Sequence, residues 1–260
     1  MSRKPPERDV ALAVQKLRVH YAKRGRLRFS SHRDFQRALE RALRRAEVPM
    51  AYSAGFSPHP KISYANSAPT GVASEAEYVE IGVTKQCDPD RMRAALDEAL
   101  PPGLDIVDVV TAATPDFVNR LEASRWRFEL PGVDLATARA AVDTFLARSE
   151  VIVERLMKNG IRKFDTREAV VSLTVSDESG VSGSQGTAEG DCCAILEVVT
   201  RHVTPSVRPD DLLAALRIAA DLVPPVPPRV TRLAQGPLIL GSTEIGDPFA
   251  PDRAALVSTS

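Results

Sequence analysis

The sequence predicts an α+β protein of two tandem ferredoxin-like (βαββαβ) domains with a disordered C-terminal tail. Hydrophobic spacing switches between the strand period and the helix period in the order β-α-β-β-α-β over residues 13–113. The same order recurs more loosely over residues 122–235. Residues 236–260 show no period, so we expect a flexible tail there. A chain of 260 residues can supply two domains that each bury a core.

The first domain opens with a strand expected over residues 16–30, where apolar and polar side chains alternate. Ser31 then caps a helix, and the Asp34 carboxylate can return to the cap N–H as a capping box. The remaining expected elements are a strand at 62–65, a strand at 78–83, a helix opening at Asp88-Pro89, and a strand at 104–110.

The second domain is expected to repeat this order. Its predicted elements are a strand at 125–130, a helix at 134–149, strands at 151–157, 168–175 and 192–200, a helix at 208–222, and a strand at 229–233. Residues 177–191 are rich in glycine, serine and acidic residues, so we expect a disordered loop within this domain.

Composition predicts a cytoplasmic protein with an uneven charge distribution. The chain has no apolar run long enough to span a bilayer, and its N-terminus has no hydrophobic core for a signal peptide. Its three cysteines make neither a disulfide framework nor a zinc-like ligand set. The formal net charge is zero, yet residues 1–65 hold 15 Lys and Arg against 5 Asp and Glu. One face could therefore suit an anionic partner, although arginine-rich surfaces also occur without that role.

The expected helix after Ser31 separates an apolar stripe from a row of arginines. Helical geometry places four arginines within one narrow sector opposite the stripe: Arg33, Arg37, Arg41 and Arg44. We call these four residues the arginine ridge. The ridge could hold phosphates, or it could be an ordinary solvated helix face.

The segment from Gly55 to Ala65 contains two prolines, which fix the backbone and hold His59 and Lys61 on a stiff support. Three nearby aromatics offer flat surfaces for stacking bases: Tyr52, Phe56 and Tyr64. The alternative is that these aromatics belong to the core.

His32 and His59 could act as acid and base in metal-free RNA cleavage. They could instead bind a metal with Cys87 or Glu77, but no ligand spacing supports this, and either histidine could be structural. We therefore assign no catalytic residue and expect no metal and no cofactor.

Four segments together resemble the radical-SAM-linked bacterial protein family, a domain of unknown function. They are residues 25–34, 41–46, 52–63 and 74–78, and residues 207–210 are the best match in the second half. Such proteins occur fused to a radical SAM protein or as a separate chain encoded beside one. This chain has no CxxxCxxC motif, so it resembles the stand-alone form. The resemblance implies a radical SAM partner. In actinobacteria-like genomes the genes of that family lie near genes for a ribonuclease E/G-type enzyme and ribosomal proteins, so the resemblance also implies RNA or a ribosome-related assembly.

These observations favour an accessory module that binds RNA or an RNA–protein substrate and works with a separate radical SAM enzyme. A metal-independent endoribonuclease is one alternative, by analogy of fold alone. A protein-interaction domain that docks on the radical SAM partner without nucleic acid is another. The expected binding residues are Arg33, Arg37, Arg41, Arg44, Tyr52, His59, Lys61 and Tyr64.

Overall fold

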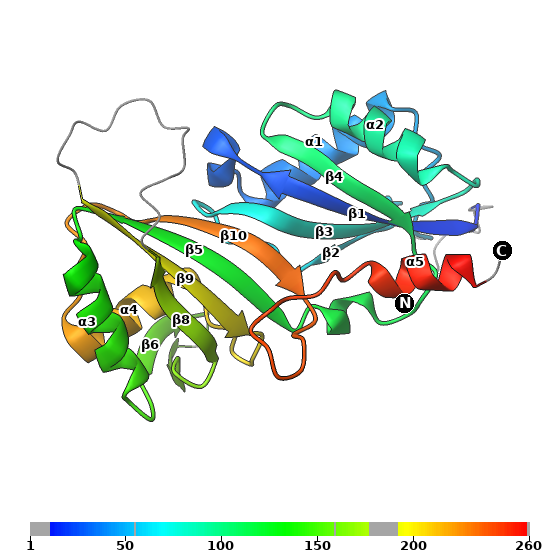
Figure 1. Cartoon of the computed structure of the whole chain (residues 1–260). Coiled ribbons are helices and arrows are strands. Elements are labelled where there is room, and N and C mark those ends of the chain that lie inside the picture. Colours follow the sequence, from blue (N-terminus) through cyan, green and yellow to red (C-terminus); the bar gives the residue numbers. More distant parts are fainter. Residues whose placement is uncertain (1–10, 55, 159, 177–191, 259–260) are drawn as a thin grey trace, which may run out of the picture. The chain divides into compact units, whose positions relative to one another are not determined.

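The computed structural model describes residues 11–54, 56–158, 160–176 and 192–258 (Figure 1). It shows a mixed α+β protein with five α-helices in the described part of the chain. The chain divides into two compact units: one runs up to Arg120 and resumes at Asp247, and the other is Leu121–Gly246. None of the described helices is both long and apolar enough to cross a membrane. The disordered loop expected at 177–191 lies outside the described residues.

The first unit contains one antiparallel sheet. Its elements are β1 (Gln15–Lys23), η1 (Gly25–Phe29), α1 (His32–Arg45), β2 (Ile62–Ala65), β3 (Ala73–Val83), α2 (Pro89–Ala99), β4 (Leu104–Thr111), η2 (Phe117–Arg120) and α5 (Ala250–Val257). β1 pairs with β3 and β4, and β2 pairs with the outer side of β3, giving the order β4-β1-β3-β2. The strand expected to continue to residue 30 ends at Lys23, because Gly25 takes a φ of 53° and a 3-10 turn follows.

Helices α1 and α2 cover one face of this sheet and enclose the main core of the unit (Figure 1). Ser31 begins α1 with the expected capping box: its hydroxyl accepts from the Asp34 N–H at 3.2 Å, and its own N–H donates to the Asp34 carboxylate. Phe35, Leu39 and Leu43 are buried against the sheet. Because this stripe is fixed in the core, the opposite side of α1 is held toward solvent.

The C-terminal segment is folded, so the expectation of a disordered tail is wrong for residues 247–257. Helix α5 begins at Ala250, and Phe249 before it is only 1% exposed. The Phe249 ring packs 5.5 Å from the Tyr78 ring and 5.6 Å from the Phe117 ring, between centroids. Contacts with residues more than a hundred positions away therefore order a helix that is too short to be stable alone.

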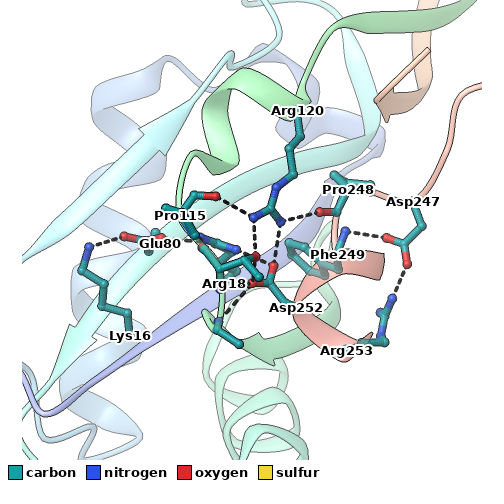
Figure 2. Close-up of polar contacts among 12 residues, drawn as sticks. Lys16, Arg18, Glu80, Pro115, Arg120, Asp247, Pro248, Phe249, Asp252 and Arg253 are labelled. Carbon is teal, nitrogen blue, oxygen red and sulfur yellow. Dashed lines mark hydrogen bonds and ion pairs between the residues drawn. The ribbon is translucent and has the colours of Figure 1, made fainter. Parts of the chain in front are cut away.

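A buried carboxylate fixes α5 to the rest of the first unit. Asp252 is completely buried and accepts from the Thr114 N–H at 2.9 Å and the Thr114 hydroxyl at 2.6 Å. It also pairs with Arg120 at 3.0 Å and with Arg18, as Figure 2 shows. Arg18 is 3% exposed and additionally contacts Glu80 at 3.2 Å. Every charge in this network thus has an opposite partner, as buried charges require.

Four strands of the second unit also pair in antiparallel fashion. Its elements are β5 (Ala123–Pro131), α3 (Leu135–Leu146), β6 (Ile152–Met157), β7 (Gly160–Asp165), β8 (Val170–Ser176), β9 (Cys193–Arg201), α4 (Pro209–Ala220) and β10 (Arg229–Gly236). The pairings give the order β10-β5-β9-β8. The expected strand at 151–157 is β6, and it pairs with β7 in a separate two-stranded hairpin.

Candidate functional site

The arginine ridge lies on the solvent side of α1. Arg33, Arg37, Arg41 and Arg44 are all exposed, and the adjacent Arg45 is exposed too. Within the described residues, none of the four makes a side-chain hydrogen bond or an ion pair. Their charges are therefore available to a partner, and phosphate oxygens are suitable acceptors for guanidinium groups.

The segment between α1 and β2 forms a loop that is closed at its base by hydrogen bonds. Tyr52 and Pro60 lie opposite each other in an isolated bridge. The Ser53 N–H donates to the His59 carbonyl at 2.8 Å, and the His59 N–H donates to the Ser53 hydroxyl at 3.0 Å. These bonds fix the backbone of His59, while its side chain stays exposed.

The base of the loop is attached to the end of β3. Ala51 donates to the Gly82 carbonyl at 2.8 Å, and the Gly82 N–H donates to the Lys61 carbonyl at 2.9 Å. A methyl group on Gly82 would lie 3.3 Å from the Ala13 side chain and 3.4 Å from that of Lys61. A glycine at this position therefore lets the segments that carry Ala13 and Lys61 lie close to the backbone of β3. Lys61 is therefore positioned through its backbone, and its side chain is exposed.

A hollow of about 220 Å³ lies between α1 and this loop. Its polar lining is Glu40, Arg44, Tyr52 and His59. Its apolar lining is Leu43, Val48, Met50, Pro58 and Pro60. The structure thus brings three of the eight expected binding residues together: Arg44, Tyr52 and His59.

The hollow also contains a residue that sequence reasoning did not select. Glu40 is half-buried on α1, one turn before Arg44. A helical pattern alone places Glu40 between the apolar stripe and the ridge, which gives no sign of a pocket. The spacing of four residues between a carboxylate and an arginine was the available signal.

Tyr64 does not line the hollow and is half-buried against the core. Its ring meets the His32 ring edge-on at 4.8 Å and the Phe35 ring at 6.0 Å. Burial, followed by the nearby Glu40 charge, raises the pKa of Tyr64 well above its ordinary value, so the phenol stays protonated. Tyr64 also lines a second hollow of about 610 Å³ together with Lys16 and Glu80.

The two histidines singled out in the sequence come from different elements. His59 lines the hollow, whereas His32 hydrogen-bonds Gln36 at 3.0 Å in the first turns of α1. No set of three or more His, Cys, Asp or Glu side chains within the described ranges could hold a metal ion. Burial also raises the pKa of the Cys87 thiol. This keeps the less reactive thiol form in place.

Comparison with known proteins gives one family match. A bacterial family described as "Uncharacterized protein conserved in bacteria (DUF2344)" matches residues 16–209. A search of curated proteins finds no match. The matched range includes α1, the loop and every residue that lines the hollow.

Proposed function

The chain belongs to this uncharacterized bacterial family, and on that premise we propose that it is an accessory module that binds RNA or an RNA–protein substrate. α1 and the adjoining loop supply the binding surface. The observation that carries the proposal is the arginine ridge, whose four exposed side chains have no hydrogen bond or ion pair within the described residues. Cations in a row contact successive phosphates and release counterions, which gives affinity without sequence preference.

The hollow supports RNA over a purely proteinaceous partner. Tyr52 lines the hollow, and its side chain is 41% exposed. Its ring therefore offers a surface on which a base can stack. A row of cations beside a hollow that contains one exposed tyrosine is typical of surfaces that bind single-stranded nucleic acid. A docking surface for an acidic protein needs only the cations.

The proposed partner is a separate radical SAM enzyme, which this module would supply with substrate. Support comes from the resemblance of the motif segments to the radical-SAM-linked family. The chain has no CxxxCxxC motif, so the iron–sulfur cluster would reside in the partner.

We also propose that each unit has the ferredoxin-like fold. In the first unit the antiparallel order β4-β1-β3-β2 supports this assignment. In the second unit β10-β5-β9-β8 is the equivalent order, with the β6–β7 hairpin inserted after α3.

Charge reversal on the ridge tests the proposed function. Arg37→Glu, Arg41→Glu and Arg44→Glu together should abolish binding of single-stranded RNA while the fold survives, because all three side chains are exposed. The matched control is Lys85→Glu, Arg91→Glu and Arg162→Glu, which changes net charge equally at three exposed sites elsewhere. Equal RNA affinity of the two folded triple variants would exclude the ridge as the binding surface.

A further inference from the structure

We propose that the hollow between α1 and the loop is a nucleobase pocket that selects guanine in single-stranded RNA. This inference rests on the RNA-binding function proposed above and names the base that the same surface would recognise. Four features carry it: the size of the hollow, its apolar walls, an exposed aromatic ring at its edge, and the pairing of a carboxylate with a guanidinium.

The size of the hollow suits one base. Its volume of about 220 Å³ exceeds the roughly 150 Å³ of an engineered protein cavity that binds benzene. It is smaller than the roughly 300–1,000 Å³ of pockets that hold whole drug-sized ligands. A single purine therefore fits, and its ribose and phosphates stay outside, beside the remainder of the arginine ridge.

The walls would hold the faces of a base without competing for its edge. Leu43, Val48 and Met50 are apolar, and Pro58 and Pro60 have no N–H to donate. The exposed ring of Tyr52 provides a surface for stacking. Any base has faces that such walls accept, so selectivity has to come from the polar side chains.

Glu40 and Arg44 supply that polar edge. They lie one turn apart on α1, and such pairs have Cβ atoms about 5–6 Å apart. No hydrogen bond or ion pair to either side chain occurs within residues 11–54, 56–158, 160–176 and 192–258. The hollow therefore presents one group that only accepts hydrogen bonds and one that only donates them.

Guanine complements both groups at once. Its N1–H and N2 amino group place two donors side by side, which a carboxylate can accept with its two oxygens. Its O6 and N7 place two acceptors side by side, which an arginine binds in the bidentate manner common in base recognition. Glu40 would accept from the first pair and Arg44 would donate to the second.

The other bases lack one of these pairs. Adenine has a single amino group between the N1 and N7 acceptors, whose lone pairs would face the Glu40 carboxylate. Cytosine likewise has one amino group beside an acceptor, and uracil has one N–H between two carbonyls. Each would leave Glu40 or Arg44 incompletely bonded in a partly dehydrated site, which lowers its affinity.

Fluorescence anisotropy with short oligouridine RNA tests the assignment. One central position carries guanosine, inosine or adenosine; inosine lacks only the N2 amino group. The native protein should bind the guanosine oligonucleotide about tenfold or more tightly than the adenosine one, with inosine between them. Equal affinity for all three overturns the inference, and this comparison needs no protein variant.

Glu40→Gln tests the same point from the protein side. It should abolish the preference for guanosine while retaining affinity for plain oligouridine, because the arginine ridge is unchanged. Glu47→Gln is the matched control: it removes the same charge just beyond the end of α1, outside the hollow, and should keep the preference. A Glu40→Gln protein that is folded by circular dichroism and still prefers guanosine would exclude Glu40 as the selecting group.

The outcomes separate this inference from the function on which it rests. Native protein that binds no RNA at all removes both. RNA binding that the ridge variant abolishes, but that shows no base preference, removes the guanine pocket alone. If free GMP binds as tightly as the guanosine oligonucleotide, the pocket recognises a free nucleotide and not a base within RNA, and the inference is wrong.

Discussion

Removal of the buried Asp252 carboxylate should destabilise the first unit severely. Asp252→Ala takes away five hydrogen-bonding contacts, to Arg18, Ala113, Thr114 and Arg120. Breaking a buried ion pair by removing one partner costs about 3–5 kcal/mol of unfolding free energy. Arg18 would keep Glu80 at 3.2 Å, so we expect the lower end of that range, about 3 kcal/mol.

The matched control is Asp247→Ala, which removes the other C-terminal acidic partner shown in Figure 2. Asp247 pairs with Arg253, and its carboxylate also accepts from the Phe249 N–H at 2.8 Å. Both paired side chains are nearly half exposed, so the loss should be smaller, about 1 kcal/mol. Urea unfolding followed by far-UV circular dichroism gives the midpoint of each variant. Equal midpoints for Asp252→Ala and Asp247→Ala would refute the argument that Asp252 anchors α5.

The same network predicts a dependence of stability on pH. Burial alone would raise the pKa of Asp252, but hydrogen bonds from Thr114 and Arg18 hold it below the ordinary value of 3.8. A carboxyl whose pKa is lower in the folded state stabilises above its unfolded pKa and loses that contribution as pH falls through the folded value. The difference in unfolding free energy between native protein and Asp252→Ala should therefore shrink below pH 3.8. A difference that stays constant as pH falls would contradict this prediction.

Two further predictions concern the loop. The double variant Pro58→Ala, Pro60→Ala should weaken RNA binding while lowering stability by only about 1–2 kcal/mol, because the tip of the loop is exposed. Calorimetric melting measures the change in stability, and calorimetric titration measures the change in affinity. A steep fall in melting temperature with unchanged affinity would show that the prolines have a structural role. The purified protein should not cleave RNA. A cleavage product whose yield depends on His59 would instead support the endoribonuclease alternative.

Local signals in the sequence predicted what local physics determines. The caps of α1 and α2 were predicted correctly, because Ser31 and Asp88 each bond an N–H three residues away. The β6–β7 hairpin was missed although Asn159-Gly160 is a strong hairpin signal.

Distant contacts account for what the sequence did not reveal. Asp252 is bonded by Ala113 and Thr114, which lie more than 130 positions earlier, so no window around residue 252 could show that α5 is ordered. The hollow is likewise lined by residues from both α1 and the loop, which pack against each other. This packing brings Glu40 into the same hollow as Tyr52 and His59. Tyr64, also expected to bind, is half-buried with its ring 6.0 Å from the Phe35 ring, a contact that the sequence did not reveal.

The most direct test of the proposed function is the salt dependence of RNA binding by the native protein. If Arg33, Arg37 and Arg41 contact phosphates while Arg44 binds a base, the logarithm of affinity for single-stranded RNA should fall with the logarithm of salt concentration at a slope of about −2. Fluorescence anisotropy at several salt concentrations measures this slope. No measurable RNA affinity at low salt, or an affinity that does not change with salt, would contradict RNA binding through the arginine ridge.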